Sequence, residues 1–86
     1  MPSERVAPTV TVRYWAGARA AAGVESDAVP GCATVGDAME AVTRMRPALA
    51  PVAAVSTLLL DGRPVRREAE LPAAAVLEVL PPFAGG

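Results

Sequence analysis

The chain has 86 residues, just over half of them hydrophobic, and its eight basic and nine acidic residues give a formal net charge of -1. This length allows one small domain with a single core, and the balanced, scattered charge gives no electrostatic basis for binding nucleic acid. Because the sequence contains no histidine, no lysine and only one cysteine, it excludes an intramolecular disulfide, offers no set of metal ligands and leaves little for acid–base catalysis by side chains.

The N-terminal residues predict no targeting segment. Residues 1–5 lack the apolar core of a signal peptide, and no run approaches the roughly 20 apolar residues that a membrane helix needs. A single cysteine fits a reducing compartment. We therefore expect a cytoplasmic protein that does not associate with a membrane.

Two strands are predicted before the main helix. Residues 9–14 alternate hydrophobic side chains with threonine and arginine, which is typical of a strand buried on one side. Residues 16–23 are rich in alanine but bracketed by glycines, so we expect at most a short helical turn there. Residues 25–29 are a weaker candidate for a second strand, antiparallel to the first and ending at Pro30-Gly31.

The first strand ends on two aromatic residues, Tyr14 and Trp15. Adjacent residues of a strand face opposite sides, so at most one of the two can lie fully in the core. We expect core or edge packing for both, with a partner surface as the alternative for the one that is left outside.

The clearest element is a helix that begins after Thr34. Thr34 can cap the helix N-terminus, and Asp37 three residues later completes a capping box and suits the helix dipole. One apolar stripe at helical spacing then comprises Val35, Ala38, Met39, Val42 and Met45. Pro47 disfavours helical geometry at Arg46, so the helix is expected to end there, and Pro51 reinforces the break.

Three strands are predicted in the second half of the chain. Residues 56–60 form a short apolar run, and Asp61-Gly62 is the strongest hairpin signal in the sequence. Pro64 restricts the returning segment to the edge of a sheet. Residues 76–80 have the pattern of the last strand.

This order of elements is typical of one α+β domain without internal repeats. It predicts a mixed sheet with one main helix across one face. We assign residues 1–80 to this domain and residues 81–86 to a flexible C-terminal tail.

The tail is the most informative segment of the chain. It reads Pro81-Pro82-Phe83-Ala84-Gly85-Gly86. The prolines project it away from the domain, the glycines can pass through a narrow slot because they lack a Cβ atom, and six extended residues span about 20 Å. A carboxylate is a poor electrophile, so we expect that of Gly86 to react only after another enzyme has activated it by adenylation with ATP.

Other residues compete weakly with the tail as a functional site. Cys32 has no base or cation near it in the sequence to lower its pKa, so we expect a small, buried or half-buried residue just before the helix. The cluster of Arg63, Arg66 and Arg67 is more typical of a solvated face of mixed charge than of a recognition patch.

Two stretches resemble a known family. Residues 14–23, Tyr-Trp-Ala-Gly-Ala-Arg-Ala-Ala-Ala-Gly, are similar to the Phe-Ala-x-Ala-Arg-x-x-Ala-Gly stretch that follows the first strand in the small subunit of molybdopterin synthase. Residues 79–86 resemble the Pro-Pro-hydrophobic-small-Gly-Gly ending of the same family. Together they identify the chain as a member of the MoaD/ThiS sulfur-carrier family, and the resemblance implies a ubiquitin-like β-grasp fold. Where the family often has an acidic turn before the last strand, this chain has residues 72–75, Pro-Ala-Ala-Ala.

The resemblance also implies roles for the tail. Gly86 would be adenylated by a ubiquitin-activating-like adenylyltransferase and converted, with sulfur from a persulfide or sulfide, to a C-terminal thiocarboxylate. Ala84 and Gly85 would line the narrow passage in the partner, and Phe83 would anchor the base of the tail there, after Pro81-Pro82. The chain would be a cosubstrate without a permanently bound cofactor, and ATP would be used by the activating partner.

The resemblance leaves the sulfur acceptor open between several pathways. The proline pair favours the large subunit of molybdopterin synthase, and another sulfur-accepting synthase, for thiamine, cysteine or natural products, is the alternative. A ubiquitin-like protein modifier joined to lysines through Gly86, and an interaction domain with an incidental tail, are the other hypotheses.

Overall fold

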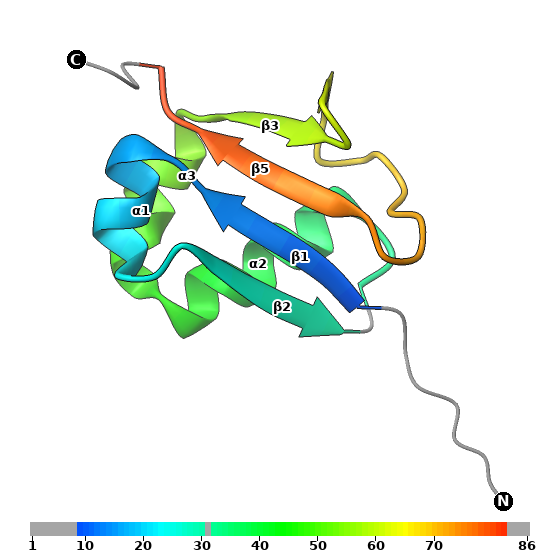
Figure 1. Cartoon of the computed structure of the whole chain (residues 1–86), viewed down its shortest axis with the longest axis horizontal. Helices are drawn as coiled ribbons and strands as arrows, with labels where there is room; N and C mark the ends of the chain where they lie inside the picture. Colours follow the sequence, from blue (N-terminus) through cyan, green and yellow to red (C-terminus); the bar gives the residue numbers. More distant parts are fainter. Residues whose placement is uncertain (1–8, 31, 83–86) are drawn as a thin grey trace, which may run out of the picture.

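The computed structural model describes residues 9–30 and 32–82 of the chain. Within them, the strands form one mixed sheet, and the helices lie against one of its faces (Figure 1). In chain order the elements are β1 (Thr9–Tyr14), α1 (Ala16–Ala22), β2 (Ser26–Pro30), α2 (Val35–Met45), the 3₁₀ helix η1 (Pro47–Leu49), α3 (Ala50–Ala54), β3 (Thr57–Leu60), β4 (Arg63–Val65) and β5 (Val76–Leu80).

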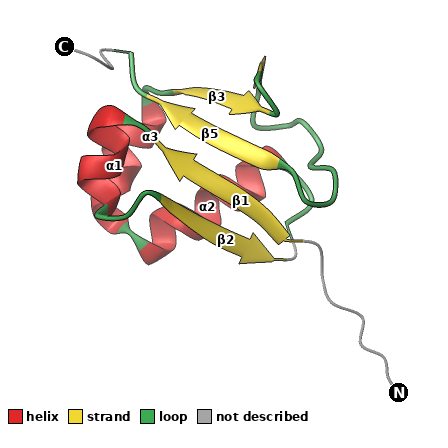
Figure 2. Ribbon diagram, in the orientation of Figure 1, coloured by secondary structure: helices red, strands yellow, loops and turns green. Residues whose placement is uncertain are grey.

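The middle strand of the sheet is β5, the last one in the sequence. The strand order is β2-β1-β5-β3-β4, with β5 parallel to β1 and antiparallel to β3. The pairs β1–β2 and β3–β4 are antiparallel. The predicted α+β architecture, a mixed sheet with its main helix across one face, is confirmed (Figure 2). Pro64 lies on the edge strand β4, as expected.

The core lies between the sheet and the helices. Alternation along β1 turns Val10, Val12 and Tyr14 inward, and β5 adds Leu77 and Val79, which have no exposed surface. The inward face of α2 consists of Val35, Ala38, Met39 and Val42. The last strand is therefore fixed both by its two neighbours in the sheet and by the core beneath it.

Helix α2 begins and ends where the sequence predicts. Thr34 Oγ1 accepts a hydrogen bond from the N–H of Asp37 at 3.1 Å, and Asp37 Oδ2 accepts one from the N–H of Thr34 at 3.2 Å, which completes the capping box. Arg46 is the C-cap. Met45 departs from the expected stripe and is 51% exposed, whereas Leu49 of η1 is fully buried.

The N-terminus of α2 is closed by the loop before β5. The N–H of Val35 donates to the carbonyl of Ala69 at 2.9 Å, and the N–H of Gly36 donates to that of Arg67 at 2.8 Å. A Cβ atom on Gly36 would lie 3.2 Å from the Arg67 oxygen. The close approach of the loop therefore depends on this glycine, and these helix N–H groups are used within the chain.

Two short helices were not predicted between α2 and β3. Pro47 and Pro51 both lie in the first turn of a helix, η1 and α3 respectively. Proline is tolerated there because the N–H that it lacks would have no helical partner. The break after α2 is therefore confirmed, and Pro51 in addition lies in the first turn of a helix that was not predicted.

Helix α1 is longer than the single turn expected. It spans seven residues and ends at Gly23, whose φ of 80° is left-handed and whose N–H donates to the carbonyl of Arg19. Ala18 and Ala22, four residues apart, are both buried. Packing of this face on the core outweighs the low helix propensity of Gly17.

Asp61 and Gly62 form the predicted tight turn between β3 and β4. Their φ values of 49° and 88° are both positive, as a type I′ turn requires. Asp61 also joins the turn to β5, because its N–H donates to the carbonyl of Val76 at 2.9 Å and its carboxylate accepts from the N–H of Val76 at 3.1 Å. Its role is structural, as expected.

Candidate functional site

The expected site residues begin where the last strand leaves the sheet. β5 ends at Leu80, Pro81 is half-buried and Pro82 is exposed. The remaining tail residues, Phe83, Ala84, Gly85 and Gly86, lie outside the described residues. Because β5 lies between β1 and β3, the tail starts from a fixed point on the domain.

The end of β1 lies beside this point. β1 and β5 run parallel with Tyr14 paired to Val79, and the N–H of Trp15 donates to the carbonyl of Val79 at 3.2 Å. The C-terminal ends of both strands therefore lie side by side at the same end of the sheet (Figure 1). Tyr14 points into the core and is 2% exposed, whereas Trp15 is half-buried on the opposite, helix-free face. Only one of the two aromatic residues lies fully in the core, as predicted.

Two charged neighbours hold Trp15 on this open face of the sheet. Its indole N–H donates to Oε2 of Glu78 at 3.1 Å. The guanidinium carbon of Arg13 lies 5.1 Å from the centre of the indole ring, within the range of a cation–π contact. Glu78 and Arg13 are direct partners across β5 and β1. We call Arg13, Trp15 and Glu78 the Trp15 cluster.

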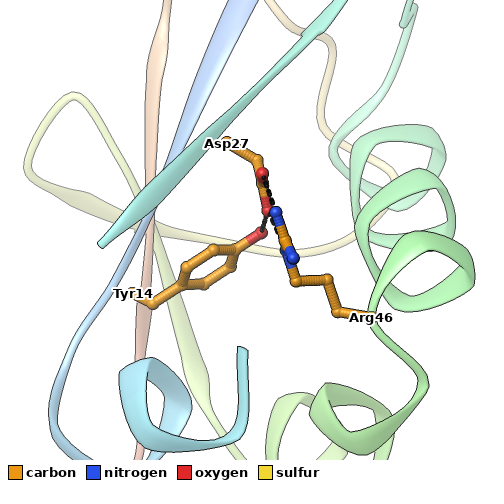
Figure 3. A network of polar contacts seen from close by, with 3 residues as sticks. All are labelled: Tyr14, Asp27 and Arg46. Atoms are coloured by element: carbon orange, nitrogen blue, oxygen red, sulfur yellow. Dashed lines mark hydrogen bonds and ion pairs between the residues drawn. The ribbon is translucent and has the colours of Figure 1, made fainter. Parts of the chain in front are cut away.

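On the inner face, Tyr14 joins a network that links β1, β2 and the end of α2 (Figure 3). Its hydroxyl donates to Oδ2 of Asp27 at 2.7 Å, and Arg46 donates from Nε and Nη2 to the same carboxylate. The hydrogen bond from Arg46 lowers the pKa of Asp27 against the opposing effect of burial. Burial, with the hydrogen bond and charge of Asp27, raises the pKa of Tyr14. Each polar group has a partner, so the network is structural.

Cys32 is half-buried, as expected. Burial and the negative charge of Asp37 raise the pKa of its thiol, so the reactive thiolate is disfavoured. Cys32 follows β2, which runs antiparallel to β1. It therefore lies at the opposite end of the strands from Leu80. Among residues 9–30 and 32–82, no group of three acidic or cysteine side chains could hold a metal ion. In this part of the chain, none of the helices combines the length and the apolar character that crossing a membrane requires.

The arginine cluster lies on the loop side of the β3–β4 hairpin. The side chains of Arg63, Arg66 and Arg67 are exposed, and the carbonyls of Arg66 and Arg67 accept hydrogen bonds that shape the loop. An open pocket nearby is lined by Leu60, Asp61, Arg63 and Val65. These features fit the expected solvated face, and a recognition role for the arginines stays a hypothesis.

Sequence reasoning missed the partners of both aromatic residues. Arg13 and Glu78 occupy outward positions of predicted strands, so their exposure could have been found from the alternation. Their contact with Trp15 could not, because Trp15 and Glu78 are 63 positions apart and the parallel pairing of β1 with β5 leaves no local signal. Two strands that are distant in sequence combine to form this site.

Comparisons with known proteins agree with this architecture. The model of the ThiS family matches residues 12–86, and no curated protein matches the chain. Among solved structures, SAMP1 from Haloferax volcanii is 26% identical with a TM-score of 0.81, over 91% of this chain and 99% of that chain. A putative molybdopterin converting factor, subunit 1, from Pyrococcus furiosus is 27% identical with a TM-score of 0.78, over 88% of this chain and 99% of that one.

A third solved structure shows the fold alone. In the complex of subunits 1 and 2 of molybdopterin-converting factor from Helicobacter pylori, the matching chain is 19% identical with a TM-score of 0.69, over 91% of this chain and 99% of that chain. The shared arrangement of a mixed sheet and helices confirms the ubiquitin-like β-grasp fold that the sequence implied.

Proposed function

The chain belongs to the ThiS family of small ubiquitin-like sulfur carriers, and from this premise we propose that it carries sulfur as a thiocarboxylate on Gly86. A ubiquitin-activating-like adenylyltransferase uses ATP to activate the carboxylate of Gly86, and a sulfur donor then replaces one carboxylate oxygen. The chain is a cosubstrate that is recharged in each cycle, and it keeps no cofactor of its own. We place this activity in the cytoplasm.

The observation that carries this proposal is the fixed starting point of the tail on the middle strand of the sheet. The family match extends through Gly86, and β5 is held by β1, β3 and the core up to Leu80. Four residues beyond Pro82 reach at most about 14 Å. An enzyme can therefore take the small residues Gly85 and Gly86 into a narrow site while the domain stays outside, with Phe83 against its entrance.

The proposed chemistry uses no side chain of this protein. A carboxylate oxygen of Gly86 attacks the α-phosphorus of ATP and releases pyrophosphate, which leaves an acyl adenylate. Hydrosulfide then attacks the carbonyl carbon, the bond to AMP breaks, and the thiocarboxylate forms. With a protein persulfide as the donor, its outer sulfur displaces AMP and forms an acyl disulfide. A second thiol then attacks the donor's sulfur, the S–S bond breaks, and the thiocarboxylate leaves while the two thiols are oxidised to a disulfide. Because the sequence has no lysine or histidine, a catalytic base has to come from the partner.

As the sulfur acceptor we propose the large subunit of molybdopterin synthase. The Pro81-Pro82 lead-in favours this branch of the family, and a similar solved protein is named as subunit 1 of a molybdopterin converting factor. A synthase of the thiamine, cysteine or natural-product pathways is the alternative acceptor. The ionised sulfur of a thiocarboxylate is a soft nucleophile at neutral pH, which suits all of these transfers.

A second candidate function is protein modification through Gly86. Similarity to SAMP1, a small archaeal modifier protein, favours it. In this reaction a lysine amine of a target attacks the activated carbonyl in place of sulfur and gives an isopeptide bond. The two functions share the activation step and differ in the nucleophile. Since the sequence contains no lysine, the chain cannot be extended through a lysine of its own.

Intact-mass measurement tests the activation step. The purified chain is incubated with ATP, sulfide and the adenylyltransferase encoded by the same genome, and we expect a gain of about 16 Da as oxygen is replaced by sulfur. A variant that lacks Gly86 serves as the control and should keep its mass. No gain for the wild-type chain, with an enzyme shown to be active on ATP, contradicts the proposal. Isopeptide adducts on cellular proteins without thiocarboxylate would favour the modifier.

A further inference from the structure

We propose that Glu78 and Arg13 are positioning residues that fix the orientation of the Trp15 side chain. In this orientation Trp15 forms a contact surface for the ATP-dependent activating enzyme. The inference rests on the proposed function, because it assigns the activating enzyme as the occupant of one surface. That surface is the open face of the sheet at the base of the tail, where the Trp15 cluster lies.

The reach of the tail limits where the activating enzyme can bind. An enzyme that acts on Gly86 has its surface within about 14 Å of Pro82, the span of four extended residues. The inner face of the sheet near this point is covered by the helices (Figure 1). On the open face, the parallel pairing of β1 with β5 places Trp15 beside Leu80, the last residue before the prolines. Trp15 therefore lies within the area that the enzyme can cover when it takes the tail.

The Trp15 cluster has the composition of an interface anchor. Trp15 is half-buried, so part of its side chain is accessible beside the guanidinium of Arg13. Tryptophan and arginine are the side chains most enriched among residues that dominate binding energy at protein interfaces. The half-buried Leu80 and Leu59 lie on the same face, since Leu59 pairs with Glu78 across β3 and β5. The open face thus offers an apolar contact surface that is flanked by one carboxylate and one guanidinium.

Glu78 fixes the orientation of the Trp15 indole ring. The indole N–H of Trp15 has its hydrogen-bond partner in Glu78 Oε2, and its backbone N–H is bound to Val79. Arg13 lies over the ring. A side chain that is ordered before binding loses less conformational entropy in the complex, so removing the acceptor on Glu78 should weaken docking without changing the chemistry at Gly86.

The test compares Glu78→Ala and Glu78→Gln in the thiocarboxylate-forming reaction. For Glu78→Ala we expect the KM of the chain to rise about three- to tenfold with kcat unchanged, because one ordered side chain becomes free. Glu78→Gln keeps an acceptor oxygen and should restore a near wild-type KM. Tyr14→Phe is the matched control, since it removes a hydrogen bond on the opposite face of the sheet and should leave KM unchanged.

Fluorescence gives a second measurement that needs no activity. Trp15 is the only tryptophan of the chain, so the anisotropy of its emission reports how freely the ring moves. We expect lower anisotropy in Glu78→Ala than in the wild type or in Glu78→Gln. Unchanged anisotropy in Glu78→Ala overturns the positioning role, and so does an equal rise of KM in both Glu78 variants or no rise in either. If the wild-type chain itself gains no sulfur, the proposed function fails first, which separates the two claims.

Discussion

Arg46 binds Asp27 through two hydrogen bonds, from Nε to Oδ2 at 2.8 Å and from Nη2 to Oδ1 at 2.7 Å. The pair connects the end of α2 to β2, and the hydroxyl of Tyr14 joins the same carboxylate from β1. Because Tyr14 pairs with Val79 of β5, the network helps to hold together the end of the sheet from which the tail leaves. Its contribution to stability can be measured separately from the chemistry of the tail.

Removal of the Tyr14 hydroxyl is expected to destabilise the fold. Tyr14→Phe keeps the buried ring and loses one hydrogen bond to a charged group, so the free energy of unfolding should fall by about 1–2 kcal/mol. Urea unfolding followed by Trp15 fluorescence measures this change. Equal stability of the variant and the wild type would show that the hydroxyl is replaced by water at no cost.

Acid should weaken the Asp27 contact. The pKa of Asp27 in the folded chain lies below its usual value, so the unfolded chain takes up the proton first as the pH falls. The stabilisation is therefore present above the usual aspartate pKa of about 3.9 and is lost as the pH drops below it.

The comparison with Asp27→Asn isolates this group from the other carboxylates. We expect the wild type to be more stable than Asp27→Asn near neutral pH, and this advantage to shrink below about pH 4. Urea unfolding of both proteins over this range measures it. An advantage that does not change with pH would contradict a lowered pKa for Asp27.

The two helical glycines should respond differently to alanine. A Cβ atom on Gly17 of α1 meets nothing within 4 Å, so Gly17→Ala should raise the free energy of unfolding by about 0.5–1 kcal/mol through helix propensity. On Gly36 a Cβ atom would lie 3.2 Å from the carbonyl of Arg67, which should cancel that gain. Thermal unfolding of both variants measures the difference, and an equal gain in both would mean that the loop moves away freely.

The loop before β5 contains one residue, Ala74, with a strained backbone conformation. Ala74 has a φ of 61°, a left-handed conformation that costs a residue with a Cβ atom about 1–2 kcal/mol. Ala74→Gly relieves this strain, whereas Ala73→Gly only adds freedom to the unfolded chain. We expect Ala74→Gly to be more stable than Ala73→Gly by about 1 kcal/mol in urea unfolding. The reverse order would show that Ala74 is not strained in solution.

Local signals in the sequence predicted most elements. The capping box at Thr34 and Asp37 set the start of α2, alternation set β1, and the Asp61-Gly62 pair set the hairpin. These features depend on residues within a few positions of one another, so sequence alone carries them. The ubiquitin-like β-grasp fold followed from the family resemblance more than from any local pattern.

Tertiary packing decided what the sequence could not predict. Burial of Ala18 and Ala22 extended α1, and the core includes Leu49 but not Met45. The contact of Trp15 with Glu78 needed the parallel pairing of two strands that are far apart in the chain. The roles of Gly86 and of the other tail residues stay proposals.

The position of the incorporated sulfur tests the sulfur-carrier proposal most directly. Oxidation of Cys32 or of one of the three methionines also adds about 16 Da, so intact mass alone does not identify a thiocarboxylate. Trypsin cleaves after Arg67 and releases residues 68–86, a peptide that contains neither cysteine nor methionine. After the activation reaction, we predict the gain in this peptide, and by fragmentation on Gly86. A gain confined to the peptides that hold Cys32 or the methionines would contradict the sulfur-carrier function.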